Sequence, residues 1–279
     1  HHMRIGLVGY GTVGRSLEEL FRRSEMNDLT IFDKNMPGLS SDDHKRAVNK
    51  CELAFVAVPT PPASDGLSAD LSAVSEVVDW LNVPICIRST IPPGSTQALV
   101  AATSKMIAFC PEYVGESPDH PWRKADDCGF LIVGGNAIVR DLVVRAYQTV
   151  VSNHFPFYQT DSTTAELCKY MENCFLAMKV AFVNQFYDIA QCLDVDFEQL
   201  RSLWLLDSRI GESHTRVTPA RGFGGKCLPK DLGAIIALMS GRGGAALLES
   251  VHAYNIAIRK NVGAQSGGRP SPKLKTSEK

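Results

Sequence analysis

The sequence predicts an α/β fold: an N-terminal doubly wound Rossmann-type sheet, followed by an α-helical domain built on one long central helix. Three observations predict it. Short runs of β-branched apolar residues alternate with helical stretches up to about residue 150, which is typical of a mostly parallel sheet covered by helices. A glycine-rich turn follows the first run, and residues 161–193 contain helix formers without Gly or Pro.

The first elements form a βαβ unit, because a strand over residues 4–9, a helix over residues 14–23 and a strand over residues 29–33 follow one another directly. Further strands are expected at residues 53–58, 85–88, 106–109 and 130–133. A connecting run over residues 154–159 leads into the long helix at residues 161–193. Later helices are expected at residues 197–206, 232–239 and 245–259.

These elements divide the chain into a Rossmann-type domain at residues 3–152, a helical central domain at residues 153–262 and a disordered tail at residues 263–279. At about 1.5 Å per residue the long helix spans about 50 Å, which exceeds the width of a small domain. We therefore expect it to link two bodies or to cross a dimer interface, and a homodimer is the predicted assembly.

Composition narrows the class of partner. A net charge of -1 gives no general attraction for nucleic acid or for an anionic membrane, so a small molecule is the expected partner. Eight cysteines without a CxxC pair argue against a disulfide scaffold and against a zinc site. We therefore expect no metal, and a cytoplasmic location. No apolar stretch is long enough to predict a membrane span.

A GxGxxG pattern stands between the first strand and the first helix: Gly9, Tyr10, Gly11, Thr12, Val13 and Gly14. Such glycines allow a tight turn and let backbone N–H groups approach a pyrophosphate. Asp33 ends the next strand, where its carboxylate can accept hydrogen bonds from ribose hydroxyls and repel a 2′-phosphate. The pattern predicts NAD rather than NADP, although Lys34 beside Asp33 weakens strict selection. A glycine-rich turn without a ligand is the competing interpretation.

Three proline-containing segments each follow a predicted strand: residues 58–61, residues 89–96 and residues 110–113. Loops at the carboxyl ends of strands form the ligand crevice of a doubly wound sheet. Their polar groups are therefore functional candidates. Taken singly, each segment could also be only a turn stiffened by proline.

One cysteine differs in its setting from the other seven. Cys227 lies in a glycine-rich loop just before a helix that is predicted to start near Pro229. Lys226 and Lys230 add positive charge, and a helix N-terminus further stabilises a thiolate. The pattern favours nucleophilic cysteine chemistry, while a structural cysteine in a turn remains the alternative.

The long helix carries a possible polar face. Glu166, Lys169 and Asn173 are spaced i, i+3 and i+7, so they lie on one side of the helix. A shared polar face could line a cleft. The competing interpretation is a stripe of solvated side chains, which is common for charged residues at helical spacing.

Together these segments resemble the UDP-glucose/GDP-mannose dehydrogenase family, in order, up to about residue 260. GYGTVG is similar to the family's nucleotide loop, AFVAVPTP to its fourth-strand segment, RSTIPPGST to its Ser-Thr-hydrophobe-Pro turn and CPEYVGES to its Asn-Pro-Glu-aromatic segment. ELCKYMENCFLAMKVAFVNQ is similar to its central helix and GFGGKCLPKD to its catalytic cysteine loop. The last two are the most specific.

The resemblance implies a four-electron, NAD-dependent oxidation of the primary alcohol of a UDP- or GDP-sugar to the carboxylate. Cys227 would form a thiohemiacetal and then a thioester. Lys169 and Asn173 would stabilise the developing oxyanion, and Asp231 would help to organise proton transfer or water. Glu112 would be the candidate base in thioester hydrolysis, and Thr90 would contact the water or the acidic group.

The resemblance also implies binding residues. Besides the glycine turn, Asp33 and Lys34, the cofactor contacts would come from Val58, Pro59, Thr60, Ser89 and Thr90. Substrate contacts would come from Glu112, Tyr113, Val114, Lys169, Asn173, Arg209, Phe223, Gly224 and Gly225. Arg209 resembles the arginine that the family sends across the dimer interface toward the substrate.

The chain departs from the family pattern in two places. Family members usually carry a third α/β domain over the nucleotide part of the substrate, and we expect this chain to lack it, as a piece of a longer protein or as a natural short form. Lys226 stands where a small residue usually precedes the cysteine, and Arg221 adds charge; both could bind an anion.

Two other functions remain open. One is a two-electron β-hydroxyacid-type dehydrogenase, which shares the fold and an analogous Lys and Asn but needs no cysteine. The other is a non-catalytic short relative that binds NAD without turning over a sugar nucleotide, or a short form that acts on a non-nucleotide substrate.

Overall fold

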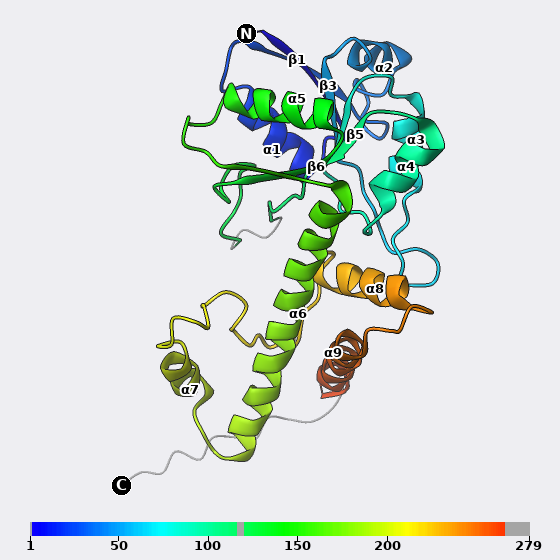
Figure 1. Cartoon of the computed structure of the whole chain (residues 1–279). Helices are drawn as coiled ribbons and strands as arrows, with labels where there is room; N and C mark the ends of the chain where they lie inside the picture. The colour runs from blue at the N-terminus through cyan, green and yellow to red at the C-terminus, as the bar shows by residue number, and fades with distance from the viewer. Residues whose placement is uncertain (1, 116–119, 266–279) are drawn as a thin grey trace. The chain divides into compact units, whose positions relative to one another are not determined.

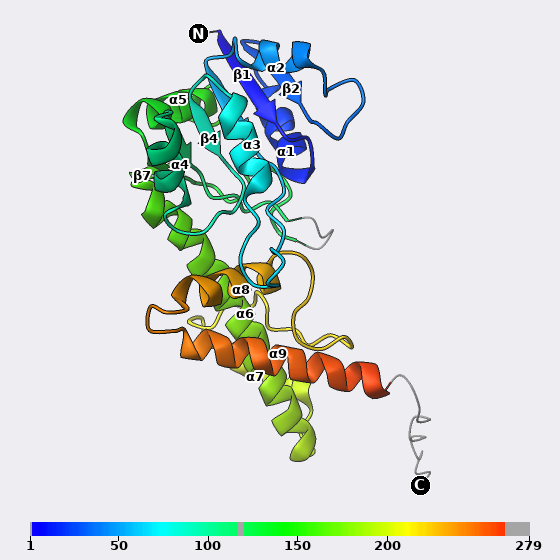
Figure 2. The same cartoon turned by 90° about the vertical axis from the view of Figure 1, so that its right-hand side faces the viewer.

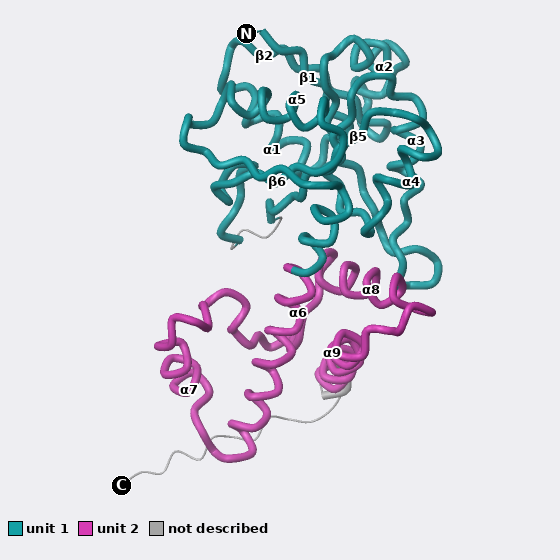
Figure 3. The backbone as a smooth tube through the Cα atoms, viewed as in Figure 1, with its two compact units in different colours: residues 1–171 teal, residues 172–279 magenta. Residues whose placement is uncertain are grey.

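The chain forms two compact units, residues 1–171 and residues 172–279 (Figure 3). The computed structural model describes residues 2–115 and 120–265 (Figure 1). The division falls inside the long helix α6 (Ser162–Cys192), beyond the boundary that the sequence predicts at residue 152. Of the predicted tail, residues 263–265 close helix α9, and residues 266–279 lie outside the described residues.

In the described part of the first unit, seven strands form one sheet in the order β2-β1-β3-β4-β5-β6-β7. All neighbouring strands are parallel except the antiparallel pair β5 and β6. The fold class is therefore confirmed. The strands are β1 (Met3–Val8), β2 (Asn27–Phe32), β3 (Leu53–Val56), β4 (Ile85–Ile87), β5 (Ile107–Phe109), β6 (Leu131–Gly135) and β7 (Phe157–Thr160).

Helices cover both faces of this sheet, because the side chains of its strands alternate between two cores. Leu53 and Phe55 pack on one side against α1 (Thr12–Phe21) and α5 (Ala137–Gln148). Ala54 and Val56 pack on the other side against α2 (Asp42–Val48) and α3 (Ser72–Trp80). Helix α4 (Ser95–Thr103) follows β4. The strand order reverses between β1 and β3, and this is the point where such sheets bind ligands.

Strand β7 is the strand that the sequence does not predict. Residues 157–159 belong to the expected connecting run, but together with Thr160 they pair in parallel with β6 at the edge of the sheet. Tyr158 and Gln159 are exposed in this strand. A half-exposed edge strand lacks the apolar run by which the other strands are recognised.

The second unit is helical. It contains the later part of α6, α7 (Phe197–Trp204), α8 (Leu228–Met239) and α9 (Ala246–Gln265). Helices α8 and α9 pack against each other (Figure 2), and Val183, Ala190 and Phe197 form a small core between α6 and α7. Helix α8 begins at Leu228, close to the start expected near Pro229. Within the described ranges, no helix is both long and apolar enough to cross a bilayer.

Candidate functional site

The glycine turn lies between β1 and α1 and can be formed only by glycine at two positions. Gly9 has φ of +96°, and a Cβ there would lie 2.1 Å from the Ala57 oxygen. A Cβ on Gly14 would lie 2.0 Å from the Gly9 oxygen. Gly11 caps α1 without a side-chain hydrogen bond and faces open space. The backbone therefore leaves the N-terminus of α1 accessible to an anion, as a pyrophosphate requires.

Asp33 lies beside this turn. Its Oδ2 accepts a hydrogen bond from the Tyr10 N–H at 2.8 Å, and its Oδ1 accepts one from the Asn35 N–H at 2.8 Å. A carboxylate has further lone pairs for ribose hydroxyls, so the turn and Asp33 fit a dinucleotide. Lys34 instead pairs with Glu76 at 2.9 Å, which draws its ammonium away toward α3.

The loops after β3 and β4 are hydrogen-bonded to each other. The Ser89 hydroxyl donates to the Val58 oxygen at 2.7 Å and accepts from the Val58 N–H at 2.9 Å. The Thr60 hydroxyl donates to the Thr90 oxygen at 2.9 Å. The structure thus brings together four of the residues expected at the cofactor site, while Pro59 between them is exposed.

Glu112 is buried, and both of its carboxylate oxygens are engaged. Oε2 accepts a hydrogen bond from Arg88 at 2.8 Å, and Oε1 accepts the N–H groups of Tyr113 at 2.7 Å and Val114 at 2.6 Å. Arg88, itself buried, also donates to the Tyr147 hydroxyl at 2.9 Å. Sequence reasoning missed Arg88, although a charged residue at the end of an apolar strand signals a buried partner.

Tyr113 presents its ring to the long helix. The Lys169 ammonium lies 4.6 Å from the centre of that ring, a cation–π distance. Trp122 and Phe130 pack edge-on against the same ring at 6.0 and 5.4 Å between centroids. Two predicted substrate contacts, Tyr113 and Lys169, are thus neighbours in the first unit.

Glu166 has a different role from Lys169 on the same helix. It is fully buried and accepts hydrogen bonds from the Gly94 N–H, the Thr96 N–H and the Thr96 hydroxyl, each at 3.1 Å. These groups belong to the start of α4, so Glu166 caps that helix. Burial raises the pKa of Glu166 to about 7. The interpretation of this face as a solvated stripe is therefore wrong.

In the second unit, Cys227 is exposed and stands at the N-cap position of α8. Its carbonyl accepts the Asp231 N–H at 2.9 Å, which closes the first turn of the helix. Gly225, two residues earlier, has φ of +77°, a conformation that favours glycine. The thiol is therefore presented at a helix N-terminus, where a thiolate is stabilised.

Asn173 and Asp231 connect α6 to α8. The Asn173 Nδ2 donates to Asp231 Oδ2 at 2.6 Å, and the two residues are 7% and 1% exposed. Among the described residues, Asp231 Oδ1 has no hydrogen-bond partner, but the Lys230 ammonium lies 3.5 Å away. Two of the predicted catalytic residues, to which the resemblance gives different roles, are therefore in direct contact.

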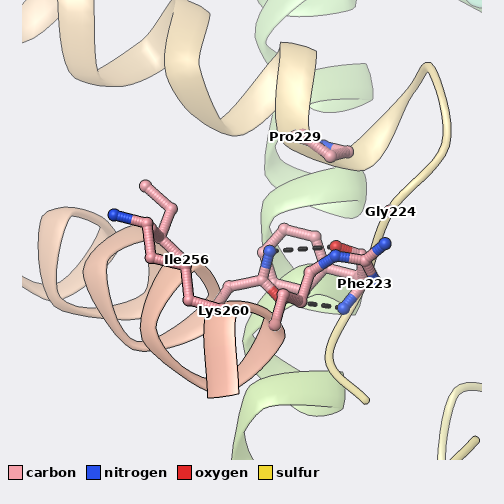
Figure 4. A pocket seen from close by; sticks show the side chains of 7 residues that line it. Phe223, Gly224, Pro229, Ile256 and Lys260 are labelled. Atoms are coloured by element: carbon pink, nitrogen blue, oxygen red, sulfur yellow. Dashed lines mark hydrogen bonds between the residues drawn. The ribbon is translucent and has the colours of Figure 1, made fainter. Parts of the chain in front are cut away.

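Phe223 and Gly224 line an open cavity of about 410 Å³ together with Pro229, Asn255, Ile256, Arg259 and Lys260 (Figure 4). Arg209 lies apart from that cavity's lining and is strongly exposed. Its guanidinium pairs with Asp207 at 2.7 Å. In the described part of the chain, no three His, Cys, Asp or Glu residues form a group that could hold a metal ion.

A doubly wound sheet with this turn and acidic residue defines a dinucleotide-binding protein, here joined to a helical unit with an exposed cysteine. Residues 25–120 match the NAD binding domain of the UDP-glucose/GDP-mannose dehydrogenase family, and residues 163–257 match its central domain. The chain belongs to this family. The prediction of NAD as the cofactor is thereby confirmed.

Similar proteins agree with this membership. A UDP-glucose 6-dehydrogenase of Rickettsia bellii is 31% identical over 207 residues, 69% of this chain and 46% of that protein. A putative UDP-glucose 6-dehydrogenase of Bacillus subtilis is 30% identical over 273 residues, 84% of this chain and 62% of that protein. The chain thus spans from under half to about three fifths of these relatives.

Solved structures also match. A UDP-glucose dehydrogenase from Pyrobaculum islandicum superposes with a TM-score of 0.78 at 26% identity, over 92% of this chain and 69% of that one. A 3-hydroxyisobutyrate dehydrogenase of Mycobacterium tuberculosis has a TM-score of 0.65 at 15% identity, over 94% of this chain and 95% of that one. The second likeness shows the fold alone.

Proposed function

We propose that the protein oxidises the primary alcohol of a UDP- or GDP-sugar to the carboxylate with NAD, through a thioester on Cys227. The observation that carries this proposal is the exposed thiol of Cys227 at the N-terminus of α8, a helix that the Asn173–Asp231 hydrogen bond fixes to α6. Family membership and the named relatives support the substrate class.

NAD, when bound, accepts the hydride that the sugar carbon gives up. The turn from Gly9 to Gly14 would hold its pyrophosphate, and Asp33 its adenosine ribose. The joined loops after β3 and β4 would line the rest of the cofactor site, with Val58, Pro59, Thr60, Ser89 and Thr90 as the contacts.

Cys227 divides the difficult second oxidation into manageable steps. Its thiolate sulfur adds to the aldehyde carbon, and the carbonyl electron pair moves onto oxygen as an alkoxide. The Lys169 ammonium and the Asn173 amide N–H would stabilise that charge. The adduct would then give up its carbon-bound hydride, for which a second NAD is the acceptor, as the alkoxide re-forms a carbonyl and leaves a thioester. Water would cleave the thioester to the acid and the thiolate. The hydrogen bond to Asp231 fixes the orientation of the Asn173 amide, because its NH2 group must face the carboxylate. The second N–H of that group would be the one that donates to the alkoxide.

The structure favours Asp231 over Glu112 as the group that takes a proton from water. Both Glu112 oxygens already accept hydrogen bonds, from Arg88 and from two backbone N–H groups. Asp231 Oδ1 makes no hydrogen bond among the described residues. We therefore assign Glu112 to positioning of the Tyr113 and Val114 backbone, and Asp231 to the proton transfer.

A homodimer through α6 belongs to the same proposal. Five large apolar side chains of the second unit are exposed along this helix and at the residue after its end, more than scattered surface residues would explain: Phe175, Phe182, Phe186, Ile189 and Leu193. Their spacing keeps them close to one side of the helix. A second copy would cover them, and the exposed Arg209 would then reach the partner's substrate.

The experiment is an NADH assay over UDP- and GDP-sugars, and over the corresponding sugar phosphates, with acid formation followed by mass spectrometry. Cys227→Ser should lower acid formation by roughly a thousandfold or more. Cys192→Ser is the matched control, because Cys192 is also exposed but ends α6, and it should leave the rate within about twofold. Unchanged acid formation by Cys227→Ser would exclude the thioester.

A further inference from the structure

We propose that Asn255 of α9 is a positioning residue for Cys227: its buried amide fixes the backbone of Phe223 and thereby the loop that carries the cysteine. This inference rests on the proposed function for its consequence in catalysis, but its geometry lies wholly within the second unit.

The first step is the pairing of Asn255 with Phe223. The Asn255 Oδ1 accepts the Phe223 N–H at 2.8 Å, and its Nδ2 donates to the Phe223 oxygen at 2.9 Å (Figure 4). Asn255 is 6% exposed, so the two bonds are formed away from water. One side chain therefore satisfies both backbone groups of one loop residue, as a neighbouring strand would, and fixes that peptide in place.

The second step is how closely the loop approaches α9. Gly222 has φ of +57°, and a Cβ there would lie 2.2 Å from Asn255 Oδ1. A Cβ on Gly224 would lie 2.7 Å from Arg259 Nη2. Arg259, one turn after Asn255, also donates to the Arg221 oxygen at 2.9 Å. Gly222 is thus required for this contact with α9, whereas the flexible end of Arg259 could move aside for a Cβ on Gly224.

A third contact holds the loop from α6. The buried Asn184 Oδ1 accepts the Arg221 Nε–H at 2.8 Å and the Gly222 N–H at 3.1 Å. Asp188 pairs with the Arg221 guanidinium at 2.8 Å. Residues 221–224 are therefore held between two helices, and Asn255 fixes Phe223, four residues before the cysteine.

The consequence for Cys227 follows from chain length. Gly224, Gly225 and Lys226 alone separate Phe223 from Cys227, and two glycines give this segment little stiffness of its own. Downstream, the Asn173–Asp231 bond fixes α8. With Phe223 fixed upstream, the thiol is confined at the helix N-terminus. Without the Asn255 amide, the backbone from Phe223 to Lys226 becomes more mobile, and the thiol is held less firmly at the helix N-terminus.

The test compares Asn255→Ala with Val251→Ala, a variant one turn earlier on α9 that truncates another buried side chain. Two experiments are made on the full chain: the NADH assay gives kcat and KM, and iodoacetamide at neutral pH gives the rate of Cys227 alkylation, with Cys192 as the internal reference. Asn255→Gln, which keeps both amide groups, is included as the conservative variant.

We expect Asn255→Ala to lower kcat at least tenfold with the KM for NAD unchanged, and to slow alkylation of Cys227 at least threefold while Cys192 reacts as before. Val251→Ala should leave both within about twofold, and Asn255→Gln should recover part of the loss. If Asn255→Ala matches Val251→Ala in alkylation, the positioning role is wrong. A wild-type protein without dehydrogenase activity would overturn the proposed function. Because alkylation needs no turnover, the comparison of alkylation rates would still decide whether Asn255 positions Cys227.

Discussion

The hydrogen bond between Asn173 and Asp231 should be one of the strongest single contacts that stabilise the second unit. The atoms are 2.6 Å apart and the carboxylate is 1% exposed. A hydrogen bond to a charged, buried group contributes about 1.5–3 kcal/mol. In Asn173→Ala, the buried Asp231 carboxylate would lose this hydrogen-bond donor and keep the Lys230 ammonium, 3.5 Å away. We therefore expect a loss of about 2–3 kcal/mol.

A double-mutant cycle separates this bond from the other effects of each substitution. Asn173→Ala and Asp231→Ala should each destabilise α8, and the double variant should be less damaged than the sum, with an interaction energy of about 2 kcal/mol. Hydrogen exchange of the amides of α8 reports the local free energy of opening, so the two units need not unfold together. An interaction energy below about 0.5 kcal/mol would refute the reasoning.

Three further predictions concern other parts of the chain. Burial raises the folded-state pKa of Glu166 from 4.5 to about 7, so its contribution to the free energy of unfolding is complete below pH 4.5 and is lost as the pH rises through 7, about 3 kcal/mol in all. Hydrogen exchange of the α4 amides should show this loss of stability with rising pH, and Glu166→Gln should abolish the pH dependence. Asp33→Ser should weaken NAD binding, measured by calorimetry, about tenfold and should reduce the preference for NAD over NADP. An unchanged ratio of the NAD and NADP affinities would count against the assignment of Asp33 to the adenosine ribose. Phe186→Glu should convert dimer to monomer in sedimentation, whereas Ile138→Glu, at a more exposed apolar position on α5, should not. A dimer that survives Phe186→Glu would exclude the α6 interface.

The elements that could be predicted from sequence are those with a strong local signal. The long helix was expected at residues 161–193 and is observed at Ser162–Cys192, because it consists of helix formers without Gly or Pro. The glycine turn and Asp33 were also placed correctly, since their order between strands and helix is local. Strand β7 was missed because it pairs at an edge with half of its side chains exposed.

The contacts of the candidate site depend on tertiary structure, and the sequence could not reveal them. Arg88 follows β4 and Glu112 follows β5; the charge on Arg88 signals a buried partner, but nothing local identifies Glu112 as that partner. Glu166 and Lys169 have the same helical spacing whether solvated or buried, so only the structure separates the cap of α4 from the neighbour of Tyr113.

The central claim, oxidation through a thioester on Cys227, is tested most directly by counting the NADH formed for each molecule of acid. A limiting amount of the sugar nucleotide that the assay selects is consumed to completion with excess NAD, and NADH is measured by absorbance against the acid formed. Oxidation through a thioester on Cys227 predicts two NADH for each molecule of acid. One NADH for each molecule of substrate, with a carbonyl compound as the product, would contradict the account and indicate a two-electron dehydrogenase.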